Sequence, residues 1–155
     1  MCVEKTPWEL VIDFHGHTCP GIALGYRIAQ LALREMGIRP TPDSECLVKA
    51  YTQSCAVDAI QVLNRATIGR RALIIEEAHK HVYQFHFTGT EEILQFTIGP
   101  KVLERLTTFK SENSSENLSP REKQNKMLEG VQYILTLEEA DFCEMERIPG
   151  QLQKV

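Results

Sequence analysis

Two histidines and a cysteine stand at alternate positions of one short segment, His15, His17 and Cys19 in HGHTC, directly before a Pro-Gly pair. In an extended segment, alternate side chains point to the same side. Imidazole and thiolate are the ligands that zinc and its neighbouring transition metals prefer. The spacing therefore allows a metal site. It also allows a polar loop, because free cysteine is common in proteins as a small buried apolar residue.

Two of the cysteines are expected where helices begin. Cys19 precedes an apolar-periodic segment over 20–36, and Cys55 follows Ser54, the expected N-cap of a second helix. The positive end of a helix dipole lowers the pKa of a thiol and favours the thiolate that a metal needs. Asp58 lies about one turn after Cys55 on the same face, where it could orient a ligand or exchange a proton with a metal-bound water. Spacing alone does not establish that Cys55 meets the HGHTC segment.

The remaining polar residues point to chemistry more weakly. In a strand, His81 shares a face with aromatic residues, which favours a histidine that lines a site over one that binds a metal. The GRR triplet at 69–71 is expected to be solvated surface charge. Three other cysteines have no ligand-like neighbours and are expected to be structural or exposed thiols: Cys2, Cys46 and Cys143.

The elements that must position these residues follow from patterns along the chain. A capping box in TPWE at 6–9 predicts a helix that runs to about Phe14. Four segments alternate like strands, with TGTE as a hairpin between the last two: 45–52, 72–78, 82–88 and 92–99. The predicted fold is α+β, a mixed or antiparallel sheet of about four or more strands packed with helices, with the metal site at helix N-termini.

Small residues form a stripe on the predicted 20–36 helix and indicate a close approach by another backbone or the wall of a site: Gly21, Gly25, Ala29 and Ala32. After one or two helical turns at 100–106, we expect a core domain to end at 108 and a polar linker to cover 109–118. A C-terminal helix and tail, 119–155, begin with a second capping box, SPRE. This helix needs an apolar surface, either on its own domain or on a second subunit with which elements are exchanged.

Composition excludes several classes of protein. A net charge of −4 gives no electrostatic footprint for nucleic acid. The apolar segments fall short of the roughly 20 residues of a membrane span, and no secretory signal is visible, so a cytoplasmic location is expected. Five cysteines at irregular spacing argue for reduced thiols rather than a disulfide framework.

Two blocks, FHGHTCPGIALGYR at 14–27 and CAVDAIQVL at 55–63, resemble the FmdE family, named for the FmdE component of formylmethanofuran dehydrogenase. The resemblance covers roughly residues 5–100. It implies a homodimer and an α+β domain in which the loop and the CAVD helix start meet around a metal, usually zinc. Position by position, the resemblance implies four metal ligands: His15, His17, Cys19 and Cys55. Asp58 lies beside them as the candidate catalytic group.

The chain also departs from the family pattern. Ala66 stands where a TGCTxGKGN segment commonly has a cysteine, and no CxxC is present, so the zinc ribbon of some members is missing. Three hypotheses stay open. In the first, the chain is a zinc-type metalloprotein that binds a small ligand or activates water. In the second, it is a metal-sensing, metal-delivering or accessory module for a molybdenum or tungsten oxidoreductase. The third, thiol redox chemistry between Cys19 and Cys55, is disfavoured by Ala66.

Overall fold

The first two helices begin as their sequences predict, in a computed structural model that describes residues 3–37 and 45–154. Helix α1, Pro7–His15, has the expected capping box, in which the Thr6 hydroxyl accepts from the Glu9 N–H at 3.2 Å. Helix α2, Pro20–Met36, has Cys19 as its N-cap, and the Cys19 Sγ accepts from the Ile22 N–H at 3.4 Å. Cys2 lies outside the described residues.

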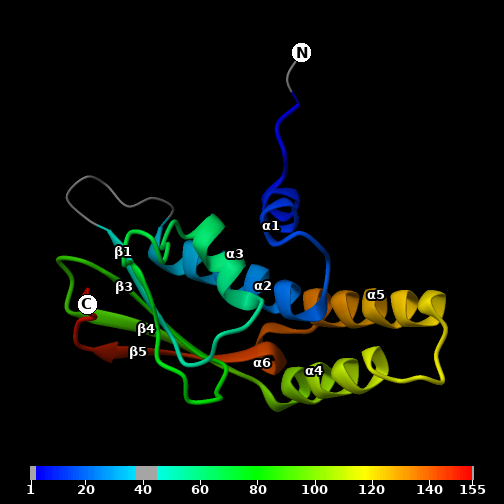
Figure 1. Ribbon diagram of the computed structural model, residues 1–155. Helices are drawn as coiled ribbons and strands as arrows, with labels where there is room; N and C mark the ends of the chain where they lie inside the picture. Colours follow the sequence, from blue (N-terminus) through cyan, green and yellow to red (C-terminus); the bar gives the residue numbers. More distant parts are fainter. Residues whose placement is uncertain (1–2, 38–44, 155) are drawn as a thin grey trace.

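The five strands of the described chain form one mixed sheet (Figure 1) in the order β2-β1-β3-β4-β5. Only the β1–β2 pair is parallel. The expected hairpin joins β3 to β4, and Gly89 in its turn has a φ of +92°, a left-handed conformation that glycine adopts without strain. The strands have these bounds: β1, Cys46–Ala50; β2, Leu73–Ile75; β3, Val82–Phe87; β4, Glu92–Ile98; β5, Cys143–Pro149.

Strand β5 is the element that the sequence pattern missed. It pairs with β4 in antiparallel register, from Glu92 opposite Pro149 to Ile98 opposite Cys143. The sequence CEMERIP carries few β-branched residues and resembles a polar tail, so only pairing with β4 reveals it as a strand. The proposed division of the chain at 108 and 118 stays a prediction, although β5 belongs to the same sheet as β1–β4.

One face of the sheet carries the main core. Alternate residues of the three central strands face α2 and α3 and are buried: Val48, Ala50, Tyr83, Phe85, Leu94 and Phe96. The rings of Phe85 and Phe96 meet edge to face with centroids 5.5 Å apart. This packing fixes the position of both helices relative to the sheet, and so fixes where their N-termini meet.

Helix α3, Ala56–Leu63, begins one residue later than predicted. Ser54 is not its N-cap; the N-cap is Cys55, and the Ser54 hydroxyl lies 3.3 Å from the Tyr83 hydroxyl instead. The helix ends before Ala66, because Asn64 and Arg65 turn the chain away, Arg65 with a φ of +56°. Cys55 therefore lies at the very start of α3.

Helices α4, Pro100–Asn113, and α5, Pro120–Thr136, lie side by side as an antiparallel pair that extends past the sheet in Figure 1. Helix α4 is longer than the one or two turns expected and takes in the first residues of the segment expected to be a linker. Its polar residues Thr107 and Thr108 return hydroxyl hydrogen bonds to carbonyls one turn earlier, which accommodates them in a helix.

Helix α5 finds its apolar surface within this chain. The expected capping box at Ser119 is present, and Val131 and Ile134 are buried against the body. Arg27 of α2 donates to the Ile134 carbonyl at 2.8 Å. The short helix α6, Glu139–Phe142, then leads directly into β5. Among the described residues, no helix has both the length and the apolar character needed to cross a membrane.

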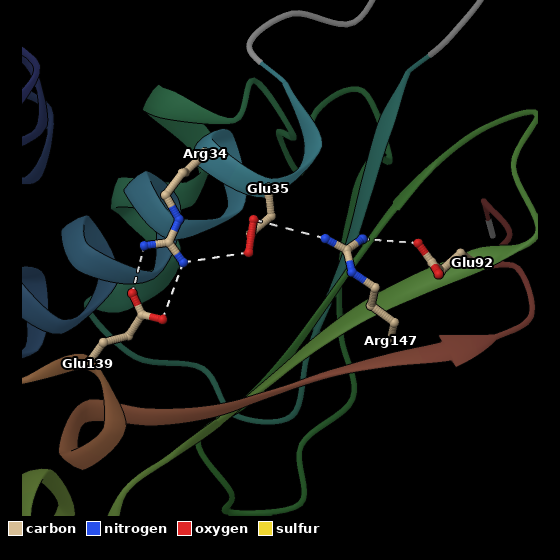
Figure 2. Close-up of polar contacts among 5 residues, drawn as sticks. All are labelled: Arg34, Glu35, Glu92, Glu139 and Arg147. Carbon is tan, nitrogen blue, oxygen red and sulfur yellow. Dashed lines mark hydrogen bonds and ion pairs between the residues drawn. The ribbon is translucent and has the colours of Figure 1, made fainter.

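A chain of ion pairs connects the end of α2 to α6 and β5, as Figure 2 shows. Arg34 donates to both carboxylate oxygens of Glu139, at 2.6 and 3.2 Å. Glu35 lies between Arg34, at 3.5 Å, and Arg147, at 3.9 Å, and Arg147 pairs with Glu92 at 3.0 Å. Such exposed pairs contribute at most about 1 kcal/mol each, so they orient these elements more than they stabilise them.

We predict that Gly25→Ala destabilises the protein by about 3 kcal/mol, the upper part of the range for overpacked cores. A Cβ at Gly25 would lie 2.4 Å from the Ala56 carbonyl oxygen and 2.5 Å from the Ala56 Cα, so α2 and α3 would have to move apart. Urea denaturation measures the change. Gly69→Ala is the control, because a Cβ there meets nothing within 4 Å. Equal stability of the two variants would contradict the prediction.

Candidate metal centre

The HGHTC segment folds into a compact donor cluster. His15 is the last residue of α1, Gly16 ends that helix with a left-handed φ of +97°, and Cys19 is the N-cap of α2. One ligand atom from each of His15, His17 and Cys19 lies within 4.8 Å of the other two. The three side chains therefore converge, although His15 ends a helix instead of lying in the extended segment that the alternation assumed, and this His/Cys cluster could hold a metal ion.

His15 is held in one orientation by a carboxylate. Its Nδ1 lies 2.7 Å from the Asp58 Oδ2, which leaves Nε2 directed at the Cys19 Sγ, 3.7 Å away. Zinc bonds of about 2.0–2.3 Å place two tetrahedral ligand atoms about 3.3–3.8 Å apart. The separation of nitrogen and sulfur fits a shared ion, and a carboxylate on the remote nitrogen of a ligating imidazole is the usual accompaniment of such a site.

Cys55 comes to the same place from the start of α3. Its side chain lies next to that of Cys19, although Cys55 is outside the cluster of three donors described above. Gly21 makes this approach possible, because a Cβ there would lie 3.0 Å from the Cys55 Cβ and 3.5 Å from its Sγ. The N-termini of α2 and α3 thus place their two cysteine side chains next to each other.

The surroundings of the two thiols shift their pKa values in opposite directions. The neighbouring Cys19 side chain, together with the nearby His15 and His17, lowers the pKa of the Cys55 thiol. The neighbouring Cys55 side chain, together with burial, raises the pKa of the Cys19 thiol. Of the two thiols, Cys55 therefore loses its proton more readily.

A cavity of about 310 Å³ opens beside the two sulfurs. Its inner wall comes from the helix starts and the preceding turn, and its outer wall from α4. The lining residues are Cys19, Gly21, Gln53, Ser54, Cys55, His81, Leu106, Phe109 and Lys110. The sequence pattern predicted a lining role for His81, but it did not reveal the α4 residues, because α4 was expected to end at 106.

The polar residues of the inner wall are hydrogen-bonded to one another. His81 Nδ1 lies 2.8 Å from the buried Tyr83 hydroxyl, which in turn contacts Ser54. Burial and the neighbouring Lys110 ammonium lower the pKa of His81, so its imidazole is neutral near pH 7. The wall therefore presents a neutral imidazole in a fixed orientation to the cavity.

The other singled-out residues lie away from this centre. Arg70 contacts Glu45 and the Arg65 carbonyl at the surface, as expected for solvated charge. Cys46 and Cys143 are buried, and burial raises their pKa values to about 12 and about 11, as expected for structural thiols. Ala66, at the position of the family's cysteine, is fully buried in the core.

Fold and site together define an α+β protein with a His/Cys cluster at converging helix starts. The chain belongs to the FmdE family: the family model described as "FmdE, Molybdenum formylmethanofuran dehydrogenase operon" matches residues 14–144. The resemblance stated from the sequence is thereby confirmed.

Two known proteins are similar to this chain. A probable S-adenosyl-L-methionine-binding protein of Archaeoglobus fulgidus is 30% identical over 73 residues, which cover 44% of this chain and 20% of that protein. The chain thus spans about a fifth of the length of this curated relative. The crystal structure of an FmdE-like protein of the tungsten formylmethanofuran dehydrogenase type, from Syntrophus aciditrophicus, has a TM-score of 0.62 at 18% identity. The match covers 92% of this chain and 70% of that one, and it confirms the α+β fold.

Proposed function

We propose that this protein holds one zinc-type ion through His15, His17, Cys19 and Cys55 and uses it to bind or activate a small molecule in the adjacent cavity. The observation that carries the proposal is the convergence of nitrogen and sulfur donors at one end of a cavity of about 310 Å³. A closed structural site would have no such space beside it. Catalytic zinc sites usually have three protein ligands and one open position, so an ion with four protein ligands would admit a small molecule by expanding to five-coordination or by releasing one ligand.

Each donor reaches the ion from a defined position. His15 binds through Nε2, because its Nδ1 is held by Asp58. Cys55 supplies the sulfur whose thiol pKa is lowered by its neighbours, so it would bind as a thiolate readily, whereas Cys19 would lose its proton on binding. An ion held here would act as a Lewis acid or lower the pKa of a bound water.

Asp58 acts in this proposal by positioning His15. Its Oδ2 contacts the imidazole and its Oδ1 accepts from the Gln61 side chain at 3.5 Å, and Asp58 is not among the residues that line the cavity. The direct acid/base role expected from the sequence stays a prediction. The neutral His81 imidazole, which does line the cavity, is the better-placed acid/base candidate.

A second candidate function is that of an accessory or metal-delivering module for a molybdenum or tungsten oxidoreductase. The description of the family refers to a formylmethanofuran dehydrogenase operon, which supports this alternative. Thiol redox chemistry between Cys19 and Cys55 is a third, supported by the contact between their side chains. A cytoplasmic location is consistent with the four cysteines of the described residues being free thiols.

We further propose a homodimer, for which the exposed apolar side chains on α4 and α5 offer a surface: Leu103, Leu128 and Tyr133. Light scattering after size-exclusion chromatography is expected to give about twice the mass of one 17.6 kDa chain. A mass of one chain at micromolar concentration would contradict the dimer and leave the metal proposal intact.

Metal content is the first test of the proposed site. Plasma mass spectrometry on protein purified without chelator is expected to find about one zinc-like ion per chain. Cys19→Ala and Cys55→Ala should each lose most of it, because each removes a thiolate ligand. Cys46→Ala is the matched control, since it removes a buried thiol away from the centre. Absence of metal from the wild type, or full retention by either site variant, would overturn the four-ligand site.

The role of Asp58 is tested by Asp58→Asn. We expect this variant to bind zinc about 10- to 100-fold more weakly, because it loses the carboxylate that orients His15. Competition with a chromogenic chelator measures the affinity. Asp13→Asn on the neighbouring helix α1 is the control, because Asp13 pairs only with exposed Lys5 among the described residues. An affinity equal to that of the wild type would show that Asp58 does not position the ligand.

A further inference from the structure

The cavity beside Cys19 and Cys55 has two chemically different walls. Its inner wall is formed by the two sulfurs, the Ser54 hydroxyl, the Gln53 amide and the His81 imidazole. Its outer wall comes from a single helix face, where Leu106 and Phe109 lie three residues apart and Lys110 follows. A molecule in the cavity would therefore contact apolar side chains on one side and polar groups on the other.

The charges around this space are unbalanced. None of the residues that line the cavity is acidic. Among residues 3–37 and 45–154, Lys110 has no ion-pair partner, like Lys80, Lys123 and Lys126, but of these four lysines it is the one that lines the cavity. Lys110 is also close enough to His81 to lower its pKa. An unpaired cation next to an apolar surface favours a ligand with a negative group and an apolar body.

We propose that this cavity binds a small aliphatic or aromatic carboxylate, with Lys110 pairing with the carboxylate and Leu106 and Phe109 contacting the hydrocarbon part. The inference rests on the proposed function, because it names the ligand class of that same site. One ammonium matches one negative charge, so a monoanion fits better than a dianionic phosphate.

The volume limits the ligand. A cavity of about 310 Å³ lies at the lower end of the roughly 300–1,000 Å³ typical of ligand pockets, which favours a small molecule. Lys110 is exposed, so its contribution is that of a solvent-screened pair, a few-fold in affinity rather than several orders of magnitude. The apolar wall would supply most of the binding, and Lys110 would supply the preference for charge.

The test compares two isosteric probes, 4-methylpentanoate and 4-methylpentanamide, which differ in charge and have the same number of non-hydrogen atoms. Isothermal titration with the protein as purified is expected to show binding of the carboxylate about tenfold tighter than of the amide. In Lys110→Gln the preference should fall about fivefold, with the affinity for the amide unchanged. The preference in the wild type should also weaken as salt is raised.

Lys101→Gln is the matched control, because it removes a lysine from the same helix outside the cavity. It should leave both affinities unchanged. Three results would overturn the proposal: no binding of the carboxylate up to about 10 mM, equal binding of the two probes, or a preference that Lys110→Gln does not alter. Tighter binding of 2-methylpropylphosphonate than of 4-methylpentanoate would likewise overturn the choice of a carboxylate.

Repeating the titration after metal removal separates this inference from the proposed function. A preference that persists without metal and still depends on Lys110 supports the cavity assignment even if the ion proves absent from the native protein. A native protein that contains its metal but binds neither probe contradicts the inference alone. A carboxylate preference that disappears with the metal and does not depend on Lys110 assigns the recognition to the ion and overturns the role of Lys110.

Discussion

The close crossing of α2 and α3 is the constraint on which the site depends. It requires glycine at two positions one turn apart, since a Cβ at Gly25 would clash with the Ala56 backbone and one at Gly21 would press on Cys55. Glycine in a helix interior costs about 1 kcal/mol of stability relative to alanine, so the close packing of α2 on α3 must offset this cost. Here it lets two helix N-termini meet, and both present a cysteine. The buried sheet face below the helices holds them in this relation.

The electrostatics of the centre follow from that meeting point. Two neighbouring sulfurs in a partly buried site repel each other when both are anionic, and the pKa of the Cys19 thiol is raised while that of the Cys55 thiol is lowered. Histidines from the preceding turn and a carboxylate from α3 complete the surroundings. A divalent ion would relieve the repulsion of a second thiolate, so the protein's own charge arrangement is one that a metal stabilises.

Much of this could be predicted from the sequence, and the failures have physical causes. Capping boxes, Pro at the first turn and apolar periodicity located α1, α2 and α5 to within a few residues, because these signals are local. The convergence of His15, His17 and Cys19 was expected from alternation in an extended loop, whereas in the structure His15 ends α1 and Gly16 turns the chain. The extent of α4 and the existence of β5 could not be predicted, since a polar helix and a polar edge strand depend on tertiary partners, α5 and β4. For the same reason the outer cavity wall could not be predicted, because Leu106, Phe109 and Lys110 share a helix face only if α4 continues beyond 106.

Strands β4 and β5 are neighbours, and Ile98 at the end of one lies opposite Cys143 at the start of the other. The chain from 99 to 142 thus leaves the sheet and returns to it at the same point, as an excursion between two adjoining strands. This excursion is anchored, because Val102, Val131 and Ile134 belong to the main core. Only its far part, where α4 passes into α5, could change in length at little cost in loop-closure entropy. The His/Cys cluster lies before the excursion in the chain, whereas the outer cavity wall lies within it. The two walls of the cavity therefore come from separate segments, and substitutions at Leu106, Phe109 or Lys110 would alter one wall without touching the cluster.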